Sequence, residues 1–315
     1  MPKEKPSSTR LFFTISFALL AVSTSSVLIR FAQEEAPSLV IAASRLLLAS
    51  LFLAPFALTK YRTELRTLSH KDLALGLLSG VFLAFHFATW ITSLEFTTVT
   101  NSVVLVSTSP LWVAILAPIF LKEKITKSIV FGMILTLIGG TIIAFSEGCT
   151  WDGGITCASL ADTSTRLSTG FGLGEASKGN FLALAGAWAI AGYLLIGRNL
   201  RAKMNLIPYI FLVYGMGAIV MLVILALTGN ALFGYSPTTY LWLLLIAIFP
   251  QLIGHSTYNW ALRFLPVALI AVTTLGEPIG SSILAFVILK EIPTTLQIIG
   301  GILILAGIYV TSRKK

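Results

Sequence analysis

Charged residues are scarce in this sequence. Lys, Arg, Asp and Glu make up 11% of the 315 residues, whereas hydrophobic residues make up 56%. Water could not hydrate the surface of a globular fold with that composition, so a soluble protein is excluded. Alternation at the period of a strand is also missing, and the apolar runs are too long for barrel strands. Because helices satisfy their own backbone hydrogen bonds in lipid, the sequence predicts an all-α membrane protein.

Side chains that carry enzymatic chemistry are equally few. The chain has three histidines, His70, His86 and His255, and only two cysteines. It contains no His-Glu-x-x-His pair, no Gly-x-Ser-x-Gly turn and no Walker A loop. These absences argue against an enzyme and against a bound metal or other cofactor. They also exclude ATP hydrolysis by this chain as a source of energy.

Ten apolar stretches are long enough to cross a hydrocarbon core, which takes about 20 helical residues. We expect each stretch to form one membrane-spanning helix, with ends that are accurate to a few residues. The ten spans cover residues 11–31, 37–58, 71–94, 97–121, 126–146, 179–199, 206–228, 238–262, 266–289 and 294–312.

Lysine and arginine are distributed unevenly over the connections between these spans. With the N terminus inside, seventeen of them fall on the inner side and four, Arg30, Arg166, Lys178 and Lys290, on the outer side. Arg45 lies within a span. The positive-inside rule therefore predicts a multi-pass protein of the cell membrane with both termini in the cytoplasm. Contact with the lipid bilayer explains the net charge of +9, and no nucleic-acid partner is needed.

The sequence repeats itself at a constant offset of 168 residues. The recurring features are Arg30 and Arg198, Leu94 and Leu262, Pro110 and Pro278, and the segments Leu121-Lys122-Glu123 and Leu289-Lys290-Glu291. We divide the chain into a first copy at 11–146, a loop at 147–178 and a second copy at 179–312. Each copy holds five spans, and an odd number forces the second copy through the membrane upside down. Inverted repeats are typical of secondary transporters, whose two halves can exchange conformations around one site.

The loop at 147–178 is much longer than the other connections and lies outside the cell in this topology. It holds both cysteines, Cys149 and Cys157, on either side of a flexible Asp152-Gly153-Gly154 turn. Two cysteines in one exported loop predict a disulfide, and zinc is disfavoured because no histidine lies nearby. The loop would then be a stapled, locally ordered segment or a partial lid. The alternative is a tolerated insertion between the repeats.

Glu277 is the sharpest candidate for a functional residue. It lies about eleven residues into the ninth span, near the membrane midplane. Pro278 follows it, and Ser109-Pro110 stands at the same position of the first copy. Paired helix interruptions in the two halves indicate the binding site of a transporter. The carboxylate is expected to bind a cationic group of the substrate or a coupled proton. The alternative is a carboxylate buried against Arg45 or a hydroxyl group to fix the packing.

Two histidines lie within spans, at nearly equivalent positions of the two copies. His86 shares a helix face with Trp90, and His255 shares one with Asn259. A histidine titrates near neutrality and could carry a coupled proton, although a lone histidine in a helix bundle more often makes structural hydrogen bonds. The candidates for walls around an apolar or aromatic substrate are Trp90, Tyr193, Tyr214, Tyr258 and Trp260, and the alternative for each is belt or core packing. Asn259 is a further candidate for binding the substrate.

Arg45 lies roughly eight residues into the second span from its outer end. A guanidinium that faces a cavity would bind a carboxylate or phosphate through two parallel hydrogen bonds. The alternative is a side chain that snorkels toward the headgroups or forms a structural pair, and we take this as the default.

Glycines gather in the fifth and tenth spans. A small residue lets two helix backbones approach closely, so we expect these two helices to pack together. The glycines concerned are Gly132, Gly139, Gly140, Gly300, Gly301 and Gly307.

The repeated features resemble the ten-helix EamA family of the drug/metabolite transporter superfamily. The resemblance rests on the twofold unit, the segments from Pro110 to Glu123 and from Pro278 to Glu291, and the glycine-rich helix after each. It implies a basket of ten helices built from two inverted five-helix repeats. It also implies a central cavity whose walls would include Trp90, Asn101, Tyr193, Tyr258 and Glu277.

Many bacterial members of that family export amino acids or other small metabolites. We therefore expect a secondary transporter that moves a small metabolite by alternating access, with an amino acid or related compound as the favoured substrate. The first alternative is an exchanger or flippase for phosphorylated, lipid-linked or nucleotide-sugar metabolites. Such substrates favour several buried Lys or Arg side chains, and only Arg45 qualifies. An uncoupled facilitator is the second alternative. The sequence leaves open whether two copies associate as a homodimer.

Overall fold

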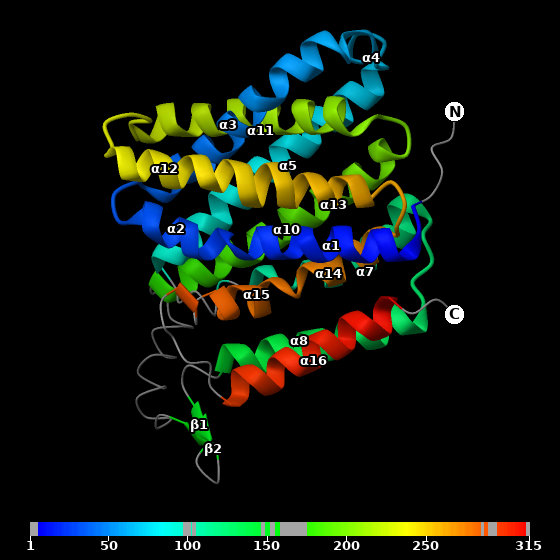
Figure 1. Cartoon of the computed structure of the whole chain (residues 1–315), viewed down its shortest axis with the longest axis vertical. Helices are drawn as coiled ribbons and strands as arrows, with labels where there is room; N and C mark the ends of the chain where they lie inside the picture. The colour runs from blue at the N-terminus through cyan, green and yellow to red at the C-terminus, as the bar shows by residue number, and fades with distance from the viewer. Residues whose placement is uncertain are drawn as a thin grey trace.

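The chain folds into helices that lie side by side along one common direction (Figure 1). The computed structural model describes residues 6–96, 102, 105–145, 149–151, 155–157, 175–284, 287–288 and 295–312. Asn101, one of the expected cavity residues, lies outside the described residues, as does most of the loop at 147–178.

The first half of the chain supplies the first five spans. α1 and α2 together form the first span, because Thr24 between them keeps a nearly helical backbone with φ −70° and ψ −15°. α4 is a short helix in the connection between the second and third spans. The helices are α1 (Ser8–Ser23), α2 (Ser25–Gln33), α3 (Ser38–Thr59), α4 (Arg62–Arg66), α5 (His70–Phe96), α7 (Ser109–Leu121) and α8 (Lys127–Phe145).

The second half supplies the other five spans. α12, the π-helix η1 and α13 follow one another without a gap and form the eighth span. Leu275 and Gly276 separate α14 from α15 within the ninth. The helices are α10 (Glu175–Arg201), α11 (Leu206–Thr228), α12 (Pro237–Ile246), η1 (Ala247–His255), α13 (Ser256–Ala261), α14 (Val267–Thr274), α15 (Glu277–Leu284) and α16 (Thr295–Ser312).

Every predicted span therefore corresponds to one or more helices. Within the described residues, six helical segments are long and apolar enough to cross a membrane. The remaining spans correspond to shorter apolar segments at Ser109–Leu121, Lys127–Ile142, Val267–Ser281 and Ile298–Thr311. The fold is the predicted all-α membrane arrangement of ten spans.

The 168-residue offset of the sequence is visible in the helix starts. The related starts are Ser38 of α3 and Leu206 of α11, Ser109 of α7 and Glu277 of α15, and Lys127 of α8 and Thr295 of α16. α1 begins at the end of the bundle where α16 finishes, whereas α10 begins at the opposite end (Figure 1). The two halves are therefore inverted repeats. We call the end that holds Ser8 and Ser312 the terminal end, and the opposite end the loop end.

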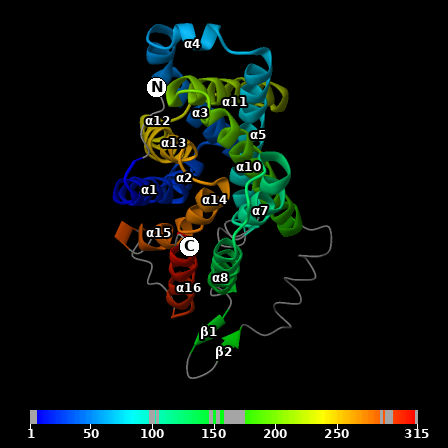
Figure 2. The same cartoon turned by 90° about the vertical axis from the view of Figure 1, so that its right-hand side faces the viewer.

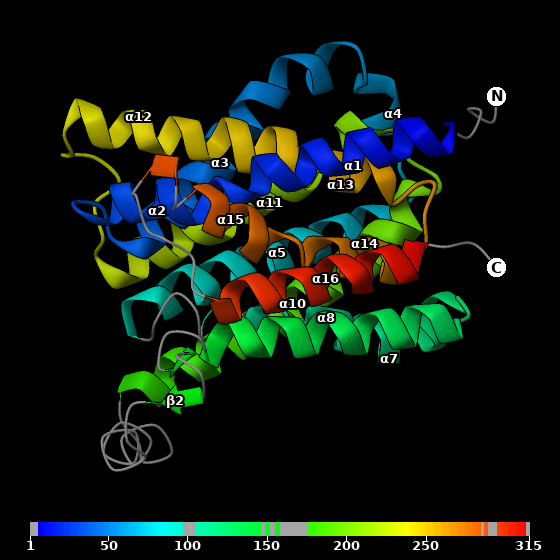
Figure 3. The same cartoon turned by 60° about the horizontal axis from the view of Figure 1, so that its bottom comes forward.

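Helix contacts follow the same symmetry. α5 packs along α10, and the repeat-related contact is that of η1 with α1. α3 packs on α11, and α8 packs along α16 (Figures 2 and 3). The interior is thus shared between the two halves, and a residue near the axis that relates them meets partners from both.

The distribution of side chains fits a surrounding of lipid. Large apolar side chains point outward, with exposed fractions of 67% for Phe12, 67% for Ile119 and 82% for Leu227. Polar side chains such as Ser79 and Gln251 are fully buried. Apolar groups can cover the outside only where the solvent is hydrocarbon, and polar groups there turn inward to find partners.

Close contact between α8 and α16 accounts for some of the predicted glycines and not for others. A Cβ atom on Gly132 would lie 2.5 Å from the carbonyl oxygen of Gly307, and one on Gly139 would lie 2.5 Å from that of Gly300. A Cβ on Gly140 would have nothing within 4 Å, and one on Gly301 would meet only an Ile279 side-chain carbon at 3.9 Å. The expectation of close packing is therefore wrong for Gly140 and Gly301, which face away from the contact.

Replacing Gly132 by Ala is expected to lower the thermal unfolding midpoint, while replacing Gly140 by Ala is not. The added methyl group at position 132 forces two backbones apart, and overpacking of this kind costs about 1–3 kcal/mol. At position 140 the methyl group meets open space, and alanine is a better helix former than glycine by about 1 kcal/mol. Thermal unfolding of the two purified variants in detergent measures the difference. Equal midpoints would contradict the close contact.

A short hairpin follows α8 at the loop end, beyond α8 and α16 (Figure 2). Its strands β1 (Cys149–Trp151) and β2 (Ile155–Cys157) are antiparallel, with Cys149 and Cys157 as direct partners. Directly opposed residues of antiparallel strands have Cα atoms about 4.5–5.5 Å apart, which lies within the range of disulfides. The backbone thus meets the requirement for the disulfide, which stays a prediction.

Candidate functional site

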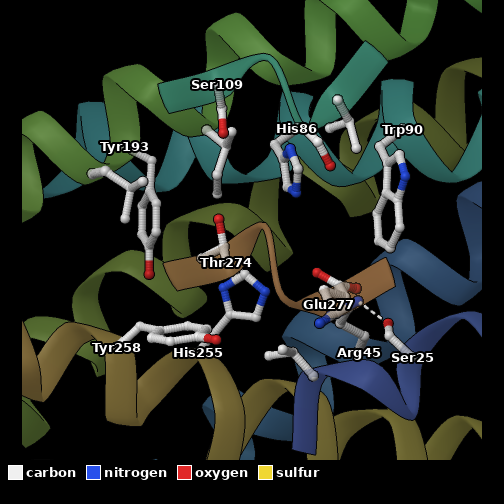
Figure 4. A pocket seen from close by; sticks show the side chains of 15 residues that line it. Ser25, Arg45, His86, Trp90, Ser109, Tyr193, His255, Tyr258, Thr274 and Glu277 are labelled. Carbon is white, nitrogen blue, oxygen red and sulfur yellow. Dashed lines mark hydrogen bonds between the residues drawn. The ribbon is translucent and has the colours of Figure 1, made fainter. Parts of the chain in front are cut away.

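A cavity of about 70 Å³ lies between helices of both halves (Figure 4). α1 and α2, α3, α5 and the start of α7 contribute from the first half, and α10 and the helices from η1 to α15 contribute from the second. The lining residues are Val22, Ser25, Arg45, His86, Trp90, Val106, Ser107, Ser109, Ile190, Tyr193, Leu194, His255, Tyr258, Thr274 and Glu277.

Most of this lining is symmetric. Ten of the fifteen lining residues form five pairs that differ by 168: Val22 and Ile190, Ser25 and Tyr193, Trp90 and Tyr258, Val106 and Thr274, and Ser109 and Glu277. Residues that come in such pairs surround the pseudo-twofold axis that relates the two halves. The cavity therefore occupies the place where proteins built from inverted repeats bind their substrates.

Two interrupted helices open onto the cavity. Ser107 and Thr108 form a turn before α7 begins at Ser109, and Leu275 and Gly276 form a turn before α15 begins at Glu277. Proline follows each start in the sequence, where the helix needs no backbone donor from it. Both interruptions predicted from Pro110 and Pro278 are thus present, and they place a hydroxyl and a carboxylate at related points of the cavity wall.

The Glu277 carboxylate lines the cavity without a hydrogen-bond donor from any residue that the structure describes. Only its backbone carbonyl oxygen accepts a hydrogen bond, from Ser23 Oγ at 3.4 Å. The two ion pairs in the described part of the chain, Arg198–Glu123 and Lys203–Asp72, do not involve it. The carboxylate is therefore available to an ammonium group or a proton that enters the cavity.

Arg45 points into the same cavity, on the side of Glu277 (Figure 4). Only 1% of its surface is exposed, so the expectation that it snorkels toward the headgroups is wrong. Its Nε donates to Gln251 Oε1 at 2.6 Å, and its Nη1 donates to Ser25 Oγ at 3.3 Å. Its guanidinium carbon lies 3.9 Å from the centre of the Phe87 ring. The helix position of Arg45 gave its depth, but the contact with Gln251 decides which way it points.

Both membrane histidines also face the cavity. His86 Nδ1 lies 3.0 Å from the carbonyl oxygen of Gly186. Because a carbonyl oxygen only accepts, Nδ1 carries the hydrogen, and Nε2 of the neutral ring is a free acceptor. The His86 ring stacks on Trp90 at 5.8 Å, and His255 meets Phe87 edge-on at 5.3 Å. His86 therefore keeps a ring nitrogen that could take a proton.

The structure separates the predicted site residues into two groups. Glu277, His86, Trp90, Ser109, Tyr193, Tyr258, Arg45 and His255 all line the cavity. Asn259 does not: it is 1% exposed, and its Nδ2 donates to the Tyr193 hydroxyl group and to the His255 carbonyl oxygen. The amide lies behind the wall and supports Tyr193, and its contact with substrate stays a prediction. Sequence reasoning missed Ser25, which the offset of 168 from Tyr193 could have found.

The comparison with known families decides the identity. The model of the EamA-like transporter family matches residues 10–145 and 177–313. The chain belongs to the EamA-like transporter family. The chain is 26% identical over 273 residues to the uncharacterized transporter YdfC of Bacillus subtilis, covering 86% of this chain and 80% of YdfC. An uncharacterized transporter of Archaeoglobus fulgidus is 23% identical over 310 residues, covering 98% of this chain and 99% of that protein.

A solved crystal structure shares the fold of this EamA-like transporter. It superposes with a TM-score of 0.74 at 17% sequence identity, and the match covers 97% of both chains. Family and fold together make the chain a multi-pass membrane transporter of small molecules, within the drug/metabolite transporter superfamily.

At the terminal end of this EamA-like transporter, Glu123 joins the two halves. Lys122 adopts a left-handed backbone with φ 56° and ends α7, which turns the chain toward Glu123. The Glu123 carboxylate accepts from Arg198 Nε at 2.5 Å and from the backbone N of Val267 at 3.1 Å. Arg198 Nη1 donates in turn to the Leu262 carbonyl oxygen at 2.6 Å. We call Glu123, Arg198, Val267 and Leu262 the terminal network.

At the loop end, Glu35 makes a comparable connection. Its carboxylate accepts from the Ser236 hydroxyl at 2.7 Å, from the Ser236 backbone N at 3.0 Å and from the Thr239 hydroxyl group. The hydrogen bonds from Thr239 and Ser236 hold the pKa of the Glu35 carboxyl group below its usual range. They fasten the turn between α2 and α3 to the start of α12. Contacts between the halves thus exist at both ends of the cavity.

Proposed function

We propose that this protein is a secondary transporter that carries a small zwitterionic metabolite, an amino acid or a related compound, out of the cell by alternating access. One observation carries the substrate class. The carboxylate of Glu277 and the guanidinium of Arg45 face the same small cavity, and among the described residues neither forms an ion pair within 4.0 Å. An amino acid offers the complementary ammonium and carboxylate groups.

The size of the cavity supports the same substrate class. A water needs about 10–15 Å³ of such space, so about 70 Å³ has room for roughly five groups of that size. That suits a compact amino acid far better than a nucleotide sugar or a lipid-linked sugar. Arg45 is also the one lysine or arginine in the cavity lining, whereas phosphate recognition favours several.

The inverted repeats support the alternating-access cycle. The two halves would exchange conformations and open the central cavity first at one end and then at the other. Glu277 is our candidate for carrying a coupled proton, with His86 and His255 as neighbours in the same cavity. We place the terminal end in the cytoplasm of the cell, from the distribution of lysine and arginine. Export is inferred from the resemblance to bacterial exporters of this family.

The test is counterflow of a labelled amino-acid mixture in proteoliposomes, with and without an imposed pH gradient. We expect labelled amino acids to accumulate against unlabelled amino acids inside, and the exchange to accelerate when the gradient is imposed. Empty liposomes treated with the same detergent give the background. Absence of counterflow for every amino acid, with protein that is monodisperse and unfolds cooperatively, would overturn the substrate class and favour phosphorylated or lipid-linked metabolites.

A further inference from the structure

The contact between Arg45 and Gln251 has no polar counterpart in the other half of the molecule. The offset of 168 relates Arg45 to Val213, and Gln251 to Leu83. The repeat relates α3 to α11 and η1 to a part of α5. α3 packs against η1, and in the same way α11 packs against α5. All four side chains are buried, with exposed fractions of 1% for Arg45 and 0% for the others. One half of the fold thus uses apolar side chains where the other half uses a guanidinium and an amide.

This difference shows that packing alone does not need the polar pair. Burying a guanidinium and an amide is costly unless every polar atom finds a partner. Here the match is incomplete, because Gln251 Nε2 forms no hydrogen bond of good geometry with a described residue, although its side chain lies close to the Tyr214 hydroxyl group. In the other half, the related helices α11 and α5 pack against each other with valine and leucine at these two positions. The cost of the polar pair is therefore best explained by a task that Arg45 performs in the cavity.

The backbone of Gln251 is also shaped differently from that of its counterpart. Gln251 lies in the π-helix η1, whereas Leu83 lies in the unbroken α-helix α5. Pro250, which lacks a backbone donor, stands within η1, and the backbone N of Ser256 bonds to the Gln251 carbonyl oxygen five residues back. π-helical turns often occur at functional sites. In η1, the wider turn carries Gln251, whose side chain reaches Arg45.

The geometry of the contact determines which nitrogens of Arg45 face the cavity. Gln251 Oε1 takes the Nε hydrogen, and Ser25 takes one hydrogen of Nη1. A guanidinium has five N–H donors, so three on its terminal nitrogens are left. Phe87 fixes the plane of the group from one side. Gln251 itself is fully buried and does not line the cavity, so it can act on a substrate only through Arg45.

We propose that Gln251 is a positioning residue, which holds the terminal nitrogens of Arg45 toward a substrate carboxylate and so sets the preference for substrates that carry one. The inference rests on the proposed function, since it assigns one end of the zwitterion to Arg45. The amide is suited to this role because it is neutral. A glutamate in its place would pair with the guanidinium and compete with the carboxylate of the substrate.

Alanine and alaninamide, which differ in the carboxylate alone, are the probes for this proposal. Their relative affinities are measured as competitors in counterflow with the full chain in proteoliposomes. We expect the wild-type protein to prefer alanine, and Gln251→Glu to reduce that preference by about tenfold or more. The KM for alanine should rise while the maximal rate and the KM for alaninamide change little. A purely structural role would instead lower transport of both probes together.

The double substitution Arg45→Val with Gln251→Leu is the matched control for folding. It copies the apolar pair of the other half, Val213 and Leu83, into this half. We expect its thermal unfolding midpoint to equal or exceed that of the wild type, while the preference for alanine is lost. Arg45→Val alone leaves the Gln251 amide buried without a partner and is expected to unfold at a lower temperature than the double variant.

The outcomes separate this inference from the proposed function. An unchanged preference for alanine in Gln251→Glu or in the double variant overturns the positioning role. If the wild type moves neither probe nor any other amino acid, the proposed function fails. The unfolding midpoints of the variants then decide whether the Arg45–Gln251 pair is needed for packing. A double variant that unfolds below Arg45→Val alone would show that the polar pair is needed for packing, which also overturns the inference. A double variant at or above the wild type supports it.

Discussion

Replacing Glu277 by Gln is expected to abolish transport driven by a pH gradient, while exchange of substrate across the membrane continues with a raised KM, because a neutral amide binds the ammonium group of the substrate more weakly than a carboxylate does. The Glu277 carboxylate lines the cavity and receives no hydrogen bond from a described residue, so it can take up a proton in one conformation and release it in the other. Glutamine has the same shape but cannot carry a proton. With one proton coupled, each unit of pH gradient supports about a tenfold accumulation, and the variant should lose all of it.

Proteoliposome assays distinguish the two modes, because counterflow needs no net proton movement and accumulation does. Glu34→Gln is the matched control: it removes a carboxylate from an exposed position in the turn between α2 and α3 and should behave like the wild type. If Glu277→Gln still accumulates substrate under a pH gradient, Glu277 does not carry the proton. If a folded Glu277→Gln protein loses counterflow even at saturating substrate, the carboxylate is required for substrate binding itself, and the prediction that exchange continues is wrong.

The repeat made much of the fold predictable from the sequence. An odd number of apolar spans per copy fixed the inversion of the halves, and the two prolines marked the interruptions before Ser109 and Glu277. The same offset pairs Trp90 with Tyr258 on the cavity wall. These features are local or periodic, so a single sequence contains them.

Features that depend on contacts between distant helices were not predictable in the same way. Arg45 and Gln251 are 206 residues apart, and no local pattern shows that they meet. Sequence position gives the depth of Arg45 in the membrane, but its direction depends on that contact. The π-helix also disturbs the regular spacing on which a helix-face argument relies. Asn259 illustrates the limit, because it shares a helix face with His255 and yet bonds to the His255 backbone behind the wall.

Replacing Glu123 by Ala is expected to favour the conformation that is open at the terminal end. The terminal network joins the turn after α7 to α10 and to the start of α14, and the two hydrogen bonds that Glu123 accepts cross between the two halves. These bonds have to separate when that end opens. The side chains of Arg198 and Glu123 are 24% and 18% exposed, so solvent weakens the ion pair. A cost of about 1–2 kcal/mol remains for such a contact, equivalent to a shift of roughly five- to thirtyfold in the conformational equilibrium.

Accessibility of a cavity thiol measures this shift. In a protein with both native cysteines replaced, Ser107→Cys places a single thiol at the cavity, and a membrane-impermeant reagent is applied from the terminal side. Labelling should be faster in Arg198→Ala than in the wild type and fastest in Glu123→Ala. The double variant should match Glu123→Ala, because both inter-half hydrogen bonds of the terminal network end on Glu123. Arg30, at the position related to Arg198 by the repeat, lies in the last turn of α2, which is at the loop end (Figure 1), so Arg30→Ala should not accelerate labelling. Equal rates in all variants would mean that the terminal network stays intact throughout the cycle, and the opening at that end would then have to occur between other helices.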